Sequence, residues 1–143
     1  MKIDPKNGIA ELLFGMKTND VERILGVPDR QFHDEDTNVI YLYHNQKLRL
    51  TFYADEDFRF GYAITSHPQA SLLGHLIIGK PVGEIIETLP FKIWETEDYD
   101  SVTNHFNESN WLTLQSEFGE IIRVELGAII DDVSDSFVWR FKS

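Results

Sequence analysis

Two stretches of the chain repeat apolar residues at helical spacing and predict short α-helices at residues 18–26 and 81–90. Gly26, followed by Pro28, ends the first stretch, and Pro90 ends the second, because glycine and proline commonly stop helices. The apolar stripes are formed by Val21, Ile24 and Leu25 in the first stretch and by Ile85, Ile86 and Leu89 in the second.

Stretches with an apolar residue at every second position predict antiparallel strands after each helix, because alternate side chains of a strand share one face. Leu48, Leu50 and Phe52 form the clearest example. Residues 9–13 also fit a short helix, and residues 71–78 are equally ambiguous. The predicted strands lie at residues 38–44, 47–54, 58–65, 102–107, 111–118, 121–128 and 137–142, with edge strands at residues 29–34 and 92–97.

The apolar pattern also matches itself along the chain. A shift of 64 residues places Leu12 on Leu76 and Leu48 on Leu112, and the two patterns stay in phase without a gap through both sets of predicted strands. Few of the matched residues are identical, so the shared phase carries the argument. The pattern indicates an internal repeat.

These observations predict an α+β protein built from two tandem units, residues 1–70 and 71–143, packed as one compact body. Each unit would hold a short helix followed by an antiparallel sheet of three to four strands. The helices would lie on one sheet face, because each alternating sheet needs only one apolar cover.

Composition narrows the class of protein. The chain has 143 residues, 42% of them hydrophobic, which suffices for a sizeable core. It has no cysteine, and its first residues include charges, a proline and a glycine where a secretory signal needs an unbroken apolar stretch, so we expect a cytoplasmic protein. The net charge of −11 disfavours binding to nucleic acid or to anionic membranes and favours basic partners.

If Leu48 and Leu50 face the helices, the residues between them face the opposite side of the sheet. That side is rich in Tyr, Trp and Arg, which are enriched in protein–protein interfaces. An equally open interpretation is that these residues cover a second small core, or that one strand has the opposite phase. The candidate partner-binding residues on this side are Tyr41, Tyr43, Arg49, Tyr53, Arg59, Trp111, Gln115 and Arg123, with Thr113 and Glu125 beside them.

An acidic cluster at residues 95–100 supplies further candidates, because Trp94 and Tyr99 flank its carboxylates with two aromatic anchors. Acidic loops can engage the basic active site of a toxin and speed association through charge. Taken alone, such a cluster is more simply a solvated turn. The candidate residues are Trp94, Glu95, Glu97, Asp98, Tyr99 and Asp100.

One motif suggests a family. Residues 15–29, with the sequence GMKTNDVERILGVPD, resemble the opening of small helix-plus-antiparallel-sheet domains that include the SmpA-type outer-membrane assembly lipoproteins. Two such units in tandem resemble the β-lactamase inhibitor proteins (the BLIP-like fold), whose joined sheets form a protein-binding surface. Together with the size and acidity of the chain, this resemblance implies an immunity protein of the bacterial contact-dependent growth inhibition type.

The sequence offers no catalytic motif, and the spacing of His33, Asp34 and Asp36 matches no metal-binding pattern. We therefore predict no catalytic residue, no metal and no cofactor, and we expect a binding protein rather than an enzyme. The leading hypothesis is a protein-binding inhibitor, an immunity protein that neutralises a cognate basic toxin domain such as a nuclease. The alternative is a cytosolic small-ligand-binding or assembly-factor domain without catalytic activity.

Overall fold

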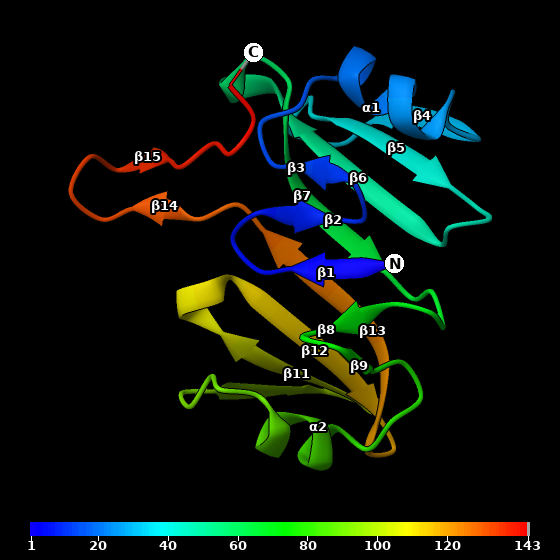
Figure 1. The fold of residues 1–143 in the computed structure, drawn as a ribbon, viewed down its shortest axis with the longest axis vertical. Coiled ribbons are helices and arrows are strands. Elements are labelled where there is room, and N and C mark those ends of the chain that lie inside the picture. The colour runs from blue at the N-terminus through cyan, green and yellow to red at the C-terminus, as the bar shows by residue number, and fades with distance from the viewer. Residues whose placement is uncertain (143) are drawn as a thin grey trace.

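The fold of residues 1–142, which are described by a computed structural model, is α+β and consists mostly of antiparallel sheet (Figure 1). The α+β class predicted from the sequence is thus confirmed. Its helical elements are α1 (Thr18–Leu25), α2 (Val82–Thr88) and the single-turn 3₁₀ helices η1 (Ala54–Glu56) and η2 (Glu108–Asn110).

Eight strands form one large antiparallel sheet in the order β10-β11-β12-β13-β7-β6-β5-β4. Its two central strands, β13 and β7, pair Leu126 with Ala63 and so join strands from the two halves of the chain. The strands of this sheet are β4 (Arg30–His33), β5 (Val39–Tyr43), β6 (Leu48–Tyr53), β7 (Arg59–Thr65), β10 (Glu95–Tyr99), β11 (Val102–Asn107), β12 (Leu112–Glu117) and β13 (Glu120–Gly127).

A smaller sheet lies across the middle of the large one, with α1 and α2 towards its two ends (Figure 1). Its order is β3-β2-β1-β8-β9, and the parallel pair β1·β8 brings Ile3 beside Leu72. A C-terminal hairpin of β14 and β15 projects from the end of β13. These strands are β1 (Lys2–Asp4), β2 (Gly8–Ile9), β3 (Leu12–Leu13), β8 (Ser71–Leu72), β9 (His75–Leu76), β14 (Ile130–Asp131) and β15 (Ser136–Phe137).

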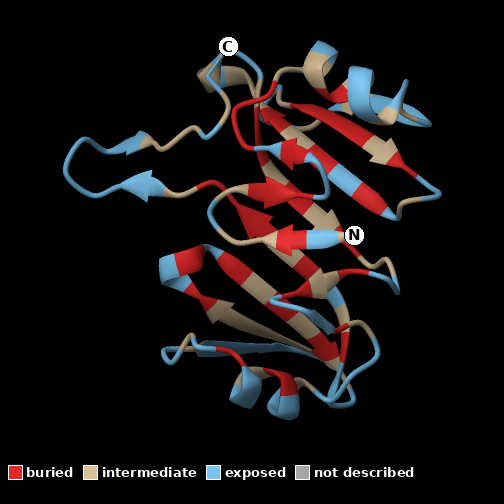
Figure 2. Cartoon of the chain, viewed as in Figure 1, coloured by how far each residue is buried: buried red, intermediate tan, exposed pale blue. Residues whose placement is uncertain are grey.

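The core lies between the small sheet and one face of the large sheet, here called the inner face. Strand residues that point inwards alternate with residues that do not, which gives the banded burial visible in Figure 2. One row of cross-strand neighbours on the inner face is fully or almost fully buried, and it consists of Tyr41, Leu50, Ala63, Leu126, Leu112 and Asn107.

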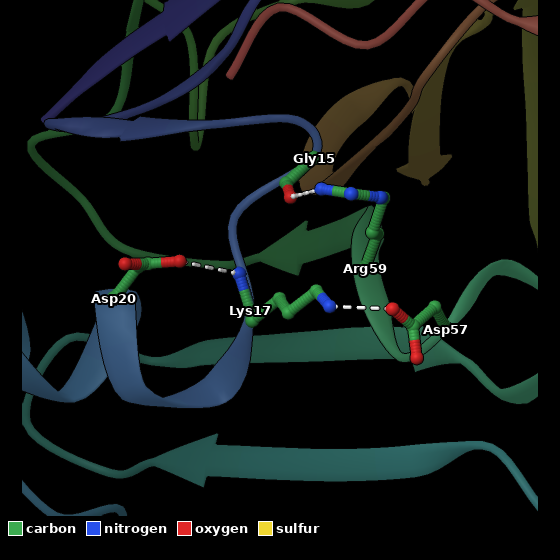
Figure 3. Close-up of polar contacts among 5 residues, drawn as sticks. All are labelled: Gly15, Lys17, Asp20, Asp57 and Arg59. Carbon is green, nitrogen blue, oxygen red and sulfur yellow. Dashed lines mark hydrogen bonds and ion pairs between the residues drawn. The ribbon is translucent and has the colours of Figure 1, made fainter. Parts of the chain in front are cut away.

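Helix α1 contributes Val21 to this core and is fixed at its start by polar contacts (Figure 3). The backbone N–H of Lys17, the N-cap residue, donates to the Asp20 carboxylate at 3.0 Å, which satisfies one group that the helix itself leaves free. The Lys17 ammonium pairs with Asp57 in the turn between β6 and β7 at 2.5 Å. These contacts hold the first turn of α1 against the large sheet.

Three segments differ from the prediction. Residues 9–13 and 71–78 contain short strands of the small sheet rather than helices. Strand β2 pairs with β1 and β3, and β8 pairs with β1 and β9, so these segments find hydrogen-bond partners that the local sequence does not reveal. The predicted strand at residues 137–142 is limited to its first residue, Phe137. Beyond it the chain leaves the hairpin, and the N–H groups of Arg140 and Phe141 donate to the carbonyl of Phe14 instead.

Candidate functional site

The face of the large sheet that points away from the small sheet and the helices is the candidate binding surface, here called the outer face. One row of cross-strand neighbours crosses all eight strands on this face, and none of its members is buried. This row contrasts with the buried row on the inner face. It consists of Arg30, Leu42, Arg49, Ile64, Glu125, Thr113, Phe106 and Glu95.

Tyr41 and Tyr43 do not belong to the outer face, so this part of the prediction is wrong. Tyr41 pairs with Leu50 across the sheet and shares its inward direction, and the two tyrosines are only 2% and 3% exposed. Their hydroxyls reach α1, where Tyr41 donates to Glu22 at 2.6 Å and Tyr43 donates to the Gly26 carbonyl at 2.9 Å. The sequence leaves this phase ambiguous because every residue of β5 is apolar or aromatic.

Tyr53 lies on the outer face but is covered by the chain itself. Its ring lies where a Cβ on Gly61 would stand, 2.2 Å from that position, and it stacks on Phe137 with the ring centroids 5.5 Å apart. Burial, followed by the charge of Asp34, raises the pKa of Tyr53. Its aromatic ring is therefore a contact of the C-terminal segment.

Arg59 also serves the fold. Its guanidinium donates to the Gly15 carbonyl at 3.0 Å, next to the start of α1 (Figure 3). A surface hollow of about 510 Å³ separates Arg59 from the C-terminal segment, with Phe137, Trp139 and Phe141 in its wall. This hollow lies apart from the exposed row of the outer face and holds no other predicted site residue.

The two candidate tryptophans have different environments. Trp111 directly precedes β12 and is 40% exposed. It packs over Gly127 and edge-on against Phe106, with ring centroids 5.2 Å apart. Trp94 packs against the core, and its indole N–H donates to the Phe91 carbonyl at 2.8 Å. Trp111 thus remains available as an anchor, whereas Trp94 does not flank the acidic cluster as an exposed residue.

The acidic cluster forms the free edge of the large sheet, because β10 is its terminal strand and is exposed along its whole length. Strand alternation sends Glu95 and Glu97 to the outer face and Asp98 to the other side, so the carboxylates do not form one surface. Glu97 accepts a hydrogen bond from Tyr99, and Asp98 accepts one from Thr103 at 2.7 Å. Asp100 lies in the turn after β10. Charged side chains on an edge strand prevent further strands from adding to it.

Arg49, Gln115 and Arg123 lie on the outer face as predicted, and Arg49 and Arg123 line a hollow there. This central groove has a volume of about 610 Å³ and crosses β5, β6, β7 and β13. The Arg49 guanidinium lies 5.7 Å from the centroid of the Phe32 ring, and Arg123 donates to the Gln115 side chain. The groove is lined by Leu42, Tyr43, His44, Lys47, Leu48, Arg49, Ile64, Thr65, Ser66, Arg123 and Glu125.

The apolar floor of this groove and one of its cations are not among the site residues predicted from the sequence. Leu42 and Ile64 were assigned no role, although they are the cross-strand neighbours that flank Arg49. Lys47 is the first residue of the predicted strand at residues 47–54, but the structure places it in the turn before β6. Knowledge of the cross-strand register would place these residues beside Arg49, but the register depends on pairing between separate segments of the chain.

In the central groove the acidic side chain has a hydrogen-bond partner, whereas the three basic side chains have no acidic partner among the described residues. The two ion pairs found within residues 1–142 are Lys17–Asp57 and Arg23–Asp20, so no carboxylate of the described chain pairs with Lys47, Arg49 or Arg123. Glu125, in contrast, accepts a hydrogen bond from the Tyr62 hydroxyl at 2.6 Å. Burial, followed by that hydrogen bond, raises the pKa of Tyr62. The groove is therefore locally cationic on a chain whose net charge is −11.

No group of three or more His, Asp or Glu side chains within the described part of the chain is placed to hold a metal ion. His105 lies on the inner face, where burial lowers its pKa and its ring contacts the Ser116 hydroxyl at 2.9 Å. Neither described helix is long and apolar enough to cross a membrane.

Comparison with known proteins finds similarity in structure but not in sequence. The sequence matches no protein-family model and no curated protein. The fold is similar to an extracellular protein containing an SCP domain from Bacillus anthracis, with a TM-score of 0.56 and 12% identity over 99% of this chain and 56% of that one. It is also similar to a cysteine-rich secretory protein from Staphylococcus aureus, with a TM-score of 0.57 and 12% identity over 87% of this chain and 46% of that one. The chain thus spans about half the length of each.

These similarities correct the family suggested by the sequence. The solved structures are SCP-domain and cysteine-rich secretory proteins, and not the β-lactamase inhibitor or SmpA-like domains from which the immunity role followed. The motif at residues 15–29 specifies one helix and its ends, which many unrelated folds share. It carries no information on the order of the strands around that helix.

Proposed function

We propose that the chain is a non-catalytic binding module that holds a protein partner on the outer face of its large sheet. The observation that carries this proposal is the uncovered cross-sheet row from Arg30 to Glu95, next to a groove of about 610 Å³. Interfaces of this kind combine aromatic and arginine side chains with a partly apolar floor, and Trp111, Arg49 and Leu42 supply these three components.

The size of the surface fits a protein partner. Eight strands spaced about 4.8 Å apart give about 34 Å between the two edge strands of the sheet. A standard interface takes about 800 Å² from each partner. A patch on only part of this face would supply that area, so the partner need not cover either edge strand.

The solved structures suggest a setting for such a module. They are described as an extracellular SCP-domain protein and a secretory protein, and this fold accounts for about half of each chain. We propose that the fold acts as an accessory unit that binds rather than reacts. The toxin-neutralising role depended on the rejected resemblance and is not proposed again, and the cytoplasmic location stays a prediction.

We also infer that the chain arose as a duplicated unit, which would make the outer face a joint surface of two related halves. Both halves contain a pair of two-residue strands, a helix and four antiparallel strands, in this order. Helix α1 begins at Thr18 and α2 at Val82, while β6 begins at Leu48 and β12 at Leu112, which is the same offset to the residue. This correspondence supports the repeat indicated by the sequence.

Site-specific photocrosslinking in the source organism tests the binding proposal. A photoreactive side chain at Thr113, on the outer face, should yield one discrete crosslinked protein. The same side chain at Glu84, on exposed α2, is the matched control and should yield none. Equal crosslinking at both positions, or crosslinking only from Glu84, would contradict the proposal.

A further inference from the structure

The central groove has a chemical character that narrows the kind of partner. Its cations come from different elements: Lys47 precedes β6, Arg49 lies on β6, and Arg123 lies on β13. All three residues are exposed, and none has a carboxylate of the described chain within 4.0 Å. Three unpaired cations in one hollow are unexpected on a chain in which acidic residues outnumber basic ones by 24 to 13.

The two arginines are held in place by their neighbours. Arg49 lies near the Phe32 ring, which attracts the cation through its π-electrons, and Arg30 approaches the same ring at 5.4 Å. The Gln115 amide, which itself donates to Asn104 at 2.9 Å, accepts the hydrogen bond from Arg123. Guanidinium groups with limited freedom lose less entropy when they bind a carboxylate in the bidentate manner.

Apolar residues separate the cations. Leu42 and Ile64 flank Arg49 as direct cross-strand neighbours, and both are half-buried. An extended polypeptide sends alternate side chains to opposite sides and can offer both carboxylates and apolar groups along one strand. The floor can therefore contact the apolar groups of a peptide, including the methylene groups of glutamate side chains, while the cations pair with its carboxylates.

We propose that the central groove binds an acidic stretch of a partner polypeptide, with Arg49 and Arg123 pairing with its carboxylates. This inference rests on the proposed binding function and specifies the chemistry of the partner. A nucleic acid would also offer negative charge, but its phosphates provide no apolar group for the floor formed by Leu42 and Ile64. The acidic peptide is the ligand that the groove favours.

The test uses the intact chain and a fluorescein-labelled oligoglutamate peptide of about ten residues, which in extended form exceeds the roughly 15 Å between the outer two of the four groove strands. Fluorescence anisotropy should detect binding to the wild-type protein that weakens as salt is added. The double variant Arg49→Gln with Arg123→Gln should bind at least about tenfold more weakly.

A control variant distinguishes binding in the groove from a general effect of net charge. The double variant Arg23→Gln with Lys80→Gln removes the same charge from exposed residues outside the groove and should bind the probe like the wild type. Thermal melts followed by circular dichroism should show that both double variants are folded. If both double variants lose affinity for the probe equally, the effect comes from net charge and the inference is overturned. Tighter binding of a single-stranded oligonucleotide than of the probe would also overturn it.

Failure of this inference differs from failure of the proposed function. If Thr113 crosslinks a partner but oligoglutamate does not bind, the outer face is a binding surface whose partner is not acidic. If oligoglutamate binding depends on the two arginines while no crosslink forms, the groove binds acidic peptides but the proposal of a protein partner on the outer face fails.

Discussion

Two glycines of the large sheet each lie beneath an aromatic ring on the outer face. A Cβ on Gly127 would stand 2.2 Å from Trp111, and one on Gly61 would stand 2.2 Å from Tyr53. Contacts this short force a side chain or the backbone to move. These positions therefore require glycine for space and not for an unusual backbone conformation.

The substitution Gly127→Ala is expected to destabilise the fold by about 1–3 kcal/mol, because the added methyl group displaces Trp111 from its place on β13. Gly83→Ala is the matched control, since no atom lies within 4 Å of its added Cβ and alanine favours the helix; it should stabilise by about 0.5–1 kcal/mol. Urea unfolding measures both. Equal stability of the two variants would contradict the packing of Trp111.

Phe118, in contrast to these glycines, is a residue whose identity the fold does not require. It is 87% exposed and forms the two-residue turn between β12 and β13 with Gly119, both at positive φ of 51° and 82°. Asparagine suits the first position of such a turn far better than phenylalanine. Phe118→Asn is therefore expected to raise the free energy of unfolding by about 1 kcal/mol.

The same turn supplies the control. Gly119→Ala introduces no steric contact but places alanine at positive φ, so it should lower the free energy of unfolding by a similar amount. A loss of stability in Phe118→Asn would mean that the phenylalanine ring packs against the protein and is not displayed to solvent.

The sequence predicts which sheet face a strand residue points to where polar and apolar residues alternate. It fails to do so where both alternate sets of residues are apolar. Arg49 and Arg123 alternate with apolar neighbours, and they face outwards as predicted. Tyr41 alternates with the equally apolar Ile40, so local pattern could not choose its direction. Ile40 is also fully buried although it lies on the outer side, outside the main core cluster. This small patch agrees with the second interpretation left open by the sequence.

At the scale of elements, two tyrosine hydroxyls attach α1 to β5. Tyr41→Phe keeps the buried ring but removes the hydrogen bond to Glu22, and it should cost about 0.5–1.5 kcal/mol of unfolding free energy. Tyr99→Phe on the exposed edge strand is the control and should leave stability nearly unchanged. Chemical denaturation compares them, and equal effects would contradict a structural role for Tyr41.

The same tyrosine predicts a pH dependence. Burial, followed by the hydrogen bond to Glu22, raises the pKa of Tyr41 to about 12. Because the unfolded value is near 10, the folded state favours the protonated form, so this contribution is complete below about pH 10 and is lost as the pH rises through 12. The tyrosinate absorbance of the folded protein should therefore lack a Tyr41 transition near pH 10, as shown by an unchanged titration in that range for Tyr41→Phe.

The elements themselves were largely predictable, because helices and strands of the large sheet have strong local periodicity. The short strands β1, β2, β3, β8 and β9 were not, because three-residue and two-residue strands show no period and depend on each other for hydrogen bonds. The path of the C-terminal segment was also hidden. Its stacking of Phe137 on Tyr53 joins residues far apart in sequence, and it covers part of the face predicted to be free.

At the scale of the molecule, the halves of the chain are interlocked. The β7·β13 pair joins them in the large sheet, the β1·β8 pair joins them in the small sheet, and one core cluster contains residues of both. We therefore expect a single cooperative unfolding transition. Far-ultraviolet circular dichroism reports on both halves, whereas Trp94, Trp111 and Trp139 all lie in the second, so the two signals should melt together. Separate midpoints would show that the halves unfold independently.

The outer face is the surface on which the whole account depends, and nuclear magnetic resonance tests it directly. Backbone amide shifts of the intact protein would be followed during titration with the oligoglutamate peptide. The largest changes should fall on β5, β6, β7 and β13, centred on Leu42, Arg49, Ile64 and Arg123. Changes centred on α1, on α2 or on the small sheet, with the central groove unaffected, would contradict it.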